Sequence, residues 1–108
     1  MTIVYYEKLM KSGVVYNIKC PGCSSCYVGQ SDRHMTTRLY EHIHKAGPMK
    51  THTTKCQVTL SGDDVDILHS TARGESFLLT LEALYIRERR PALNTKDETR
   101  RRELVIKL

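Results

Sequence analysis

Tryptophan is absent from this chain of 108 residues and phenylalanine occurs only once, so that aromatic residues make up 6% of the sequence. The hydrophobic core must therefore consist mainly of leucine, isoleucine and valine. A chain of this length can form one domain with one modest core, but not two. A small core of this kind often needs a metal ion or a disulfide bond to stabilise it.

Long apolar runs are absent as well. No segment approaches the ~20 apolar residues that a membrane-spanning helix needs. The first residues also lack the basic segment followed by an apolar one that marks a secretory signal. We therefore expect no membrane partner. Internal repeats and low-complexity tracts are lacking too, and a hydrophobic content of 40% argues for a folded globule.

Positive charge, in contrast, is in excess. The chain has 17 lysines and arginines against 12 aspartates and glutamates, which gives a formal net charge of +5. A basic surface favours binding to polyanions. The same excess is also common in soluble domains that merely have a face rich in lysine and arginine, so charge alone does not define a function.

Three of the four cysteines lie within seven residues, at Cys20, Cys23 and Cys26, and Cys56 follows later. Adjacent C-x-x-C pairs in a chain without an export signal indicate metal binding more than disulfide bonds. With the H-x-x-x-C segment that begins at His52, they can supply a closed, tetrahedral structural zinc site. We expect zinc to bind Cys20, Cys23, His52 and Cys56. Cys26 is an alternative to Cys23, and free reduced thiols are the alternative to a metal site.

Three segments are predicted to be strands. Residues 14–19 alternate and are rich in β-branched and aromatic side chains, and residues 26–30 and 65–69 are similar. A turn signal, Pro21-Gly22, lies between the first two strands. We therefore expect an antiparallel hairpin whose loop holds the clustered cysteines.

The first predicted long helix follows this hairpin. Ser31 or Asp32 can cap it, and it runs to about Lys45, where Gly47-Pro48 ends it. Its apolar stripe recurs every four residues and consists of Met35, Leu39 and Ile43. A neighbouring stripe carries Arg38, His42 and Lys45.

The second predicted long helix runs from Glu75 to about Glu88, and Glu82 is its most informative residue. At ~100° per residue, Glu82 lies between Leu78 and Ile86, inside the apolar arc of the helix. A carboxylate in that place is costly unless it is paired or binds a metal ion. The alternatives are therefore a metal ligand, a glutamate paired with an arginine, and a helix flank that meets water.

The remaining segments complete the predicted architecture. Residues 3–11 are expected to form a short helix or an ordered lead-in, and residues 49–64 a polar loop. A last charged helix or strand is expected over residues 97–107. The predicted fold class is α+β, with a small antiparallel sheet of about three strands flanked by helices, in a single domain that covers residues 1–108.

The predicted hairpin carries a recognisable pair of motifs. Val14-Val15-Tyr16 and Tyr27-Val28-Gly29 resemble the paired triplets of the GIY-YIG nuclease family, and ten residues separate the two tyrosines, as is typical of that family. The first triplet departs from the pattern, because Gly13 lies one residue too early and Val14 takes the glycine position. This departure concerns the backbone and removes no chemical group.

Four later residues extend the resemblance over residues 13 to about 95. Arg38 and His42 stand where the family has an arginine and often a histidine one turn later. Glu82 stands at the position of the family's metal-binding glutamate, and Asn94 at that of its late asparagine. The ordered set is much more specific than either triplet.

The chain is most similar, within this family, to the nuclease module of Penelope-like retroelements. Those modules have a C-x-x-C inside the first hairpin and a downstream histidine pair. Here Cys20-Pro21-Gly22-Cys23 lies between the triplets and His52-Thr53-Thr54-Lys55-Cys56 follows, with cysteine as the last ligand. The resemblance implies a DNA-cleaving nickase that is joined to a reverse transcriptase in the full-length protein, and from that role a nuclear location.

The resemblance also implies a role for each site residue. Glu82 would hold one Mg²⁺ or Mn²⁺ at the scissile phosphate, and hard oxygen ligands suit those ions. Arg38 would grip the phosphate with its planar fork, and Tyr16 would take a proton from water. Because an ordinary tyrosine titrates near 10, Tyr16 needs nearby positive charge or a relay. The residues expected to orient it or to bind DNA are Tyr27, His42, Lys45 and Asn94.

Two other functions compete with this interpretation. A non-catalytic, zinc-stabilised nucleic-acid-binding module would explain the charge, the cysteines and the basic segment Arg100-Arg101-Arg102, but it would not explain Glu82. A protein-interaction domain with a degenerate nuclease fold is the third alternative. The complete set of tyrosines, arginine, glutamate and asparagine argues against degeneration.

Overall fold

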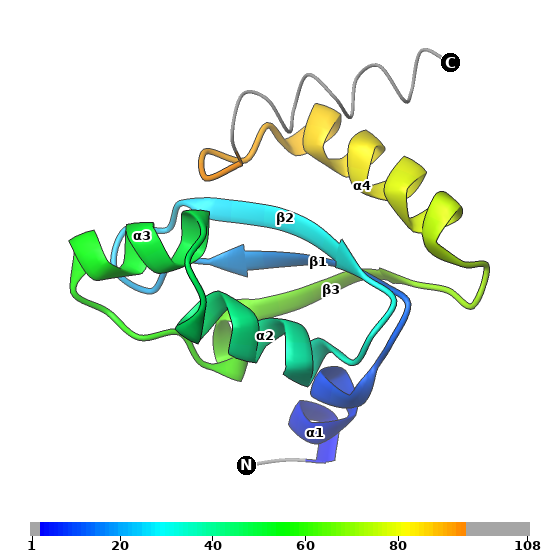
Figure 1. Ribbon diagram of the computed structural model, residues 1–108, viewed down its shortest axis with the longest axis horizontal. Helices are drawn as coiled ribbons and strands as arrows, with labels where there is room; N and C mark the ends of the chain where they lie inside the picture. The colour runs from blue at the N-terminus through cyan, green and yellow to red at the C-terminus, as the bar shows by residue number, and fades with distance from the viewer. Residues whose placement is uncertain (1–2, 95–108) are drawn as a thin grey trace.

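Two paired strands form the centre of the molecule. In the computed structural model, which describes residues 3–94, β1 (Val14–Lys19) and β2 (Cys26–Ser31) pair in antiparallel register. β3 (Val65–Ser70) pairs antiparallel with the other side of β1, which gives the strand order β2-β1-β3 (Figure 1). The predicted antiparallel sheet is confirmed, and each strand was predicted to within one residue.

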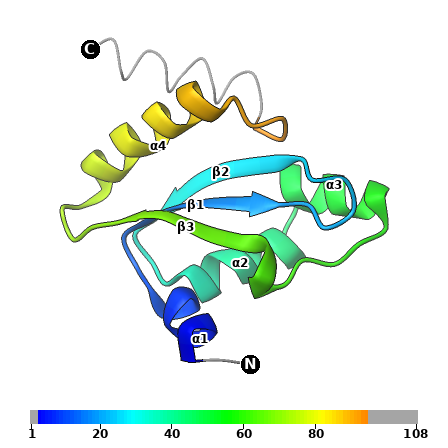
Figure 2. The same cartoon turned by 180° about the vertical axis from the view of Figure 1, so that it is seen from behind.

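Helices flank this sheet, as an α+β fold requires. They are α1 (Ile3–Met10), α2 (Met35–His44), α3 (Pro48–Cys56), the short 3₁₀ helix η1 (Gly62–Asp64) and α4 (Glu75–Arg89). Figures 1 and 2 show α2 across one face of the sheet and α4 beyond β2. The last predicted element, over residues 97–107, lies outside the described residues.

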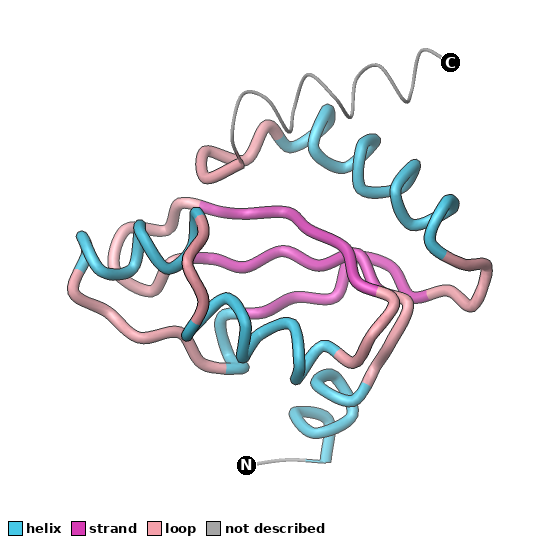
Figure 3. The backbone as a smooth tube through the Cα atoms, viewed as in Figure 1, coloured by secondary structure: helices cyan, strands magenta, loops and turns pink. Residues whose placement is uncertain are grey.

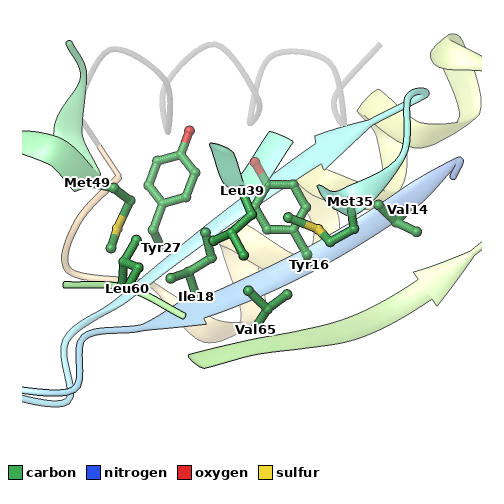
Figure 4. Packing of buried hydrophobic residues seen from close by; sticks show 9 residues of the cluster. All are labelled: Val14, Tyr16, Ile18, Tyr27, Met35, Leu39, Met49, Leu60 and Val65. Atoms are coloured by element: carbon green, nitrogen blue, oxygen red, sulfur yellow. The ribbon is translucent and has the colours of Figure 1, made fainter. Parts of the chain in front are cut away.

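Alternation along β1 divides the core into two clusters. Val14, Tyr16 and Ile18 face the side covered by α2, and Val15 faces α4. The larger cluster, shown in Figure 4, consists of Val14, Tyr16, Ile18, Tyr27, Met35, Leu39, Met49, Leu60 and Val65. The smaller one consists of Val15, Val28, Leu78 and Ile86. Because the period of a strand is two residues, a one-residue slip of β1 would exchange these two faces.

The start of α2 differs from the prediction. The helix begins at Met35 after the extended residue His34, and neither Ser31 nor Asp32 caps it. Ser31 is the last residue of β2, and its hydroxyl accepts a hydrogen bond from the backbone N–H of Arg33 at 3.0 Å. The serine therefore closes the turn between strand and helix instead of beginning the helix.

The polar loop predicted for residues 49–64 is wrong in its first half, because α3 occupies residues 48–56. Pro48 starts this helix, where its missing N–H is not needed. Thr53 and Thr54 donate their hydroxyls to the carbonyls of the preceding turn, and Met49 is fully buried. Tertiary packing thus maintains a helix whose sequence is mostly polar.

Gly13 has a structural reason for standing just before β1. Its φ is +61°, and a Cβ at this position would overlap the carbonyl group of Thr71. The backbone N–H of Thr71 donates to the carbonyl of Gly13 at 2.8 Å, which ties the start of β1 to the end of β3. Glycine is required here because only it combines this backbone conformation with so close a contact.

Candidate active site and metal centre

The ring of Tyr16 crosses directly over Gly29 of the neighbouring strand. The two residues are paired across the β1–β2 ladder, and a Cβ on Gly29 would lie 2.6 Å from Cζ of Tyr16. The same Cβ would lie 3.0 Å from a ring carbon of Tyr27. Figure 4 shows both tyrosine hydroxyls on the side away from β3. The glycine of the second triplet therefore leaves the space that lets the Tyr16 hydroxyl pass over β2.

His42 lies between the two tyrosines. Its Nε2 is 2.7 Å from the hydroxyl oxygen of Tyr16, and its ring meets that of Tyr27 edge-on at a centroid distance of 5.1 Å. α2 buries the imidazole against the sheet, where it is 7% exposed. Burial first, and then the charge of Arg38, lower the pKa of His42 to about 4. The imidazole is therefore neutral near pH 7 and can accept a proton.

The phenol of Tyr16 resists ionisation by itself. Burial raises the pKa of Tyr16 well above its ordinary value, and the nearby charge of Arg38 opposes this effect. Tyr27 and Glu82 also lie close enough to raise the pKa of Tyr16. A free phenolate is therefore unfavourable at neutral pH, and the Tyr16 hydroxyl instead shares a hydrogen bond with Nε2 of His42.

Arg38 belongs to a network of charges around Glu41. The carboxylate of Glu41 contacts Arg33 at 2.7 Å, Arg38 at 3.1 Å and Lys45 at 3.7 Å. Hydrogen bonding with Arg33 is the main cause that lowers the pKa of Glu41 to about 2. Glu41 was not predicted from the sequence, although it lies three residues from Arg38 and four from Lys45, which is the spacing of ion pairs on a helix.

A cavity of about 300 Å³ opens beside these groups. Its wall is formed by Tyr27, Arg38, Glu41, His42 and Lys45, together with the turn between α2 and α3 and Lys50. Four of the predicted site residues therefore line one concave surface: Tyr27, Arg38, His42 and Lys45. An anion that enters this cavity meets a guanidinium group and two lysine side chains.

Glu82 lies in the apolar arc of α4, as predicted. It is 5% exposed, and Leu78 and Ile86 on either side of it are buried as well. Its charge acts on Tyr16, which belongs to β1. α4 thus brings a carboxylate into electrostatic reach of the phenol that β1 supplies. Carboxylate oxygens are ligands that suit hard divalent cations.

Asn94 performs a structural task in the described chain. After α4 the chain turns back toward β2 (Figure 3). The Asn94 side chain accepts a hydrogen bond from the backbone N–H of Val28 and donates one to its carbonyl, both at 2.9 Å. These contacts fasten the segment after α4 to the outer edge of β2. They give Asn94 a structural role, and the substrate contact predicted from the sequence stays a prediction.

The four predicted zinc ligands converge. The sulfur atoms of Cys20, Cys23 and Cys56 and one ring nitrogen of His52 all lie within 4.8 Å of one another. His52 Nε2 is 3.0 Å from the sulfur of Cys23 and 3.4 Å from that of Cys56. The hairpin loop supplies two ligands and one face of α3 the other two. This group could hold a metal ion, and a Cys₃His set is typical of structural zinc.

The loop geometry selects Cys23 over Cys26. Cys26 begins β2 and lies outside the four-ligand group; its sulfur is near the carbonyl of Ser24, at 3.6 Å. The backbone N–H of Gly22 donates to the sulfur of Cys20 at 3.4 Å. A Cβ on Gly22 would press on Val58 at 3.1 Å, so glycine allows the knuckle to pack closely.

The thiols of the group differ in their acidity. Hydrogen bonding with Ser25 is the largest cause that lowers the pKa of Cys23 to about 6, whereas burial and the neighbouring thiols raise the pKa of Cys56 to about 11. Without a cation, the three sulfurs could not all be ionised at neutral pH. A bound metal ion would remove that restriction, because thiolates are its ligands.

Comparisons with known proteins add no relative. A scan against models of protein families, a search of curated proteins and a search of solved structures each found no match. Within residues 3–94, no helix has the length and apolar character needed to cross a membrane. A functional proposal for this chain therefore rests on its own residues.

Proposed function

We propose that this chain is a divalent-metal-dependent DNA endonuclease of the GIY-YIG type. The observation that carries the proposal is the convergence of four chemically different groups from three elements. Tyr16 comes from β1, Arg38 and His42 come from α2, and the buried Glu82 comes from α4. Hydrolysis of a phosphodiester needs proton transfer from water, charge neutralisation and assistance to the leaving oxygen. This set can meet all three needs.

In the proposed mechanism the proton moves by relay. Tyr16 accepts a proton from the attacking water as its own hydroxyl proton passes to Nε2 of His42, which is neutral near pH 7. Arg38 neutralises the charge that grows on the phosphate. Tyr27, whose ring meets that of His42 edge-on, helps to hold the imidazole in place. Glu82 would hold Mg²⁺ or Mn²⁺, which supplies electrostatic stabilisation of the leaving oxygen.

The structural zinc group suits a nuclease with a small core. Cys20, Cys23, His52 and Cys56 join the hairpin to α3, and the turn before α3 forms part of the cavity wall. Zinc at this position would fix the cavity without taking part in cleavage. In line with the resemblance to Penelope-like modules, we propose that the nuclease nicks target DNA for a linked reverse transcriptase in the nucleus.

Plasmid nicking tests the proposal directly. Supercoiled plasmid should be converted to the open circular form in the presence of Mg²⁺ or Mn²⁺ and should remain supercoiled with EDTA. Glu82→Ala should abolish nicking but retain DNA binding in a gel-shift assay, because only the metal ligand is lost. Glu88→Ala, an exposed glutamate on the same helix, is the matched control and should nick normally.

The opposite outcome would favour the non-catalytic alternative. If the wild-type chain binds DNA but never nicks it with any divalent ion, the chain is a zinc-stabilised binding module. If pure Glu82→Ala nicks as fast as the wild type, the assignment of Glu82 is wrong.

A further inference from the structure

Arg38 lies on the wall between two cavities. One is the cavity of about 300 Å³ described above, whose far side carries Lys45 and Lys50. The other has a volume of about 200 Å³ and is lined by Arg33 and Arg38 together with Gln30, Asp32 and Glu75. Each cavity therefore has a cation of its own in addition to the shared Arg38.

The spacing of these cations follows the axis of α2. Arg33 precedes the helix, Arg38 lies in its second turn and Lys45 follows its last residue. Because the helix rises about 1.5 Å per residue, the seven residues from Arg38 to Lys45 span about 10 Å. One strand of a duplex has a charge about every 3.4 Å along the axis. The helix positions can therefore match a strand over about two to three nucleotides on the Lys45 side, although the charged ends of Arg33, Arg38 and Lys45 all contact the carboxylate of Glu41 in the free protein.

Exposure and charge also suit a polyanion. The side chain of Arg33 is 53% exposed and that of Lys45 is 69% exposed, whereas the Glu41 side chain that contacts them is 14% exposed. Glu41 holds the cations side by side but cancels only one of their charges. Asp32 and Glu75 line the second cavity as well. The four cations Arg33, Arg38, Lys45 and Lys50 therefore exceed the three carboxylates beside them by one. The excess of positive charge lies on the side of Lys45 and Lys50.

Resting on the proposed nuclease function, we propose that the two cavities are phosphate subsites on opposite sides of the scissile phosphate. Arg38 binds the scissile phosphate, Lys50 with Lys45 binds a phosphate of the same strand on one side, and Arg33 binds one on the other side. The substrate is then a strand that continues in both directions. A scissile phosphate at the very end of a chain would fill one subsite only and would be cut poorly.

The salt dependence of binding tests the two new contacts without requiring cleavage. In the Glu82→Ala background, binding to one fixed duplex is measured over a series of salt concentrations. Arg33→Ala and Lys50→Ala should each lower the slope of log affinity against log salt by about 1, as the loss of one phosphate contact does. Lys55→Ala and Arg87→Ala remove the same charge from exposed positions that line neither cavity, and they should leave the slope unchanged.

A phosphate scan then tests the placement. A neutral methylphosphonate is introduced at single positions around a nick mapped with the wild-type enzyme. The wild type should lose cleavage efficiency for substitutions on both sides of the nick. Lys50→Ala should become less sensitive on one side, where Lys45 remains, and Arg33→Ala should become insensitive on the other, because each variant already lacks a contact that the substitution removes.

Each result separates this inference from the proposed function. Equal slopes for all four variants would overturn the subsites, even if the chain nicks DNA. Loss of sensitivity on the same side in both variants would overturn their placement around the scissile phosphate. If the chain never nicks DNA, but the slope changes only in Arg33→Ala and Lys50→Ala, the proposed strand-binding residues would be supported and the proposed nuclease function would be wrong.

Discussion

At the scale of single residues, Tyr16 shows how the environment alters a side chain's chemistry. A tyrosine in a strand is usually a packing residue, and the ring of Tyr16 does pack in the larger core cluster. Its hydroxyl, however, is directed to a neutral imidazole at 2.7 Å. Burial makes a free phenolate unfavourable, so in the proposed mechanism Tyr16 transfers a proton between water and His42 and does not act as an independent base.

Tyr16→Phe should therefore separate packing from catalysis. The ring remains, and the lost hydrogen bond should cost only about 1 kcal/mol of unfolding free energy. The cleavage rate should fall by on the order of a hundredfold or more, as it does when proton transfer is removed. Single-turnover cleavage and urea unfolding measure the two effects. Tyr40→Phe, on the exposed side of α2, should change neither. Normal cleavage by Tyr16→Phe would eliminate the relay.

Gly29 gives a second prediction at this scale. Gly29→Ala forces its new methyl group against the ring of Tyr16, where Cζ would be 2.6 Å away. Overpacking of this kind typically costs about 1–3 kcal/mol, and the displaced hydroxyl should no longer meet His42. We expect a lower midpoint in urea together with slow cleavage. Gly47→Ala is the control, since nothing lies within 4 Å of a Cβ there. Equal behaviour of the two variants would contradict this account of the triplet.

At the scale of elements, α3 carries two of the four residues that could bind the structural metal ion. The helix buries Met49 and Thr53 but is otherwise polar, and its last turn carries His52 and Cys56 four residues apart. Residues at that spacing lie on one face of a helix. The hairpin loop supplies Cys20 and Cys23 to the same point, so a metal ion there would join the hairpin to α3 in addition to the apolar contacts of Met49.

Metal removal should therefore release this connection. We expect about one equivalent of zinc per chain in native mass spectrometry, and loss of helical circular dichroism on strong chelation, because metal binding and folding are coupled in such sites. Cys20→Ser and Cys56→Ser should each lower stability strongly, whereas Cys26→Ser should not. A metal-free chain with an unchanged spectrum, or a Cys26→Ser variant that loses zinc, would contradict the ligand set.

The elements also show where pattern reasoning succeeds and where it fails. The strands were predicted to within one residue because alternation and β-branched side chains are local signals that the sheet reinforces. The start of α2 and the whole of α3 were missed because local signals there serve another purpose: Ser31 closes a turn, and Pro48 begins a helix instead of ending one. The start of α2 and the presence of α3 depend on contacts between residues that are distant in the sequence, and a short stretch of sequence does not contain those contacts.

At the scale of the whole molecule, the same distinction applies to the site. The family resemblance predicted which side chains would matter, and the described residues place Tyr16, His42 and Arg38 around one region of the sheet. It could not predict the Glu41 network or the passage of a ring over Gly29. Both depend on the exact distance between α2 and the hairpin. Asn94 was identified from its position in the family pattern. Its contact with Val28 could not be predicted, because it depends on how the chain turns after α4.

The buried imidazole of His42 should affect the stability of the whole fold. Its pKa is lowered from the ordinary 6.5 to about 4, so between these values the unfolded chain binds a proton that the folded chain does not. The unfolded state is thus favoured by acid, and the free energy of unfolding should fall as the pH falls through this window. The pKa of Glu41 is lowered from 4.5 to about 2, so its contribution is lost only at lower pH.

His42→Gln isolates this effect, because glutamine does not titrate and can still accept a hydrogen bond from Tyr16. The variant should be less stable than the wild type at neutral pH but should lose less stability from about pH 7 to about pH 5. Urea unfolding followed by circular dichroism gives both values. Acid also weakens metal binding to the cysteine and histidine ligands, but that loss is common to both proteins and cancels in the comparison. His69→Gln, an exposed histidine on β3, should lose as much stability as the wild type. If His42→Gln loses as much stability as the wild type over the same range, the imidazole is not held neutral by burial.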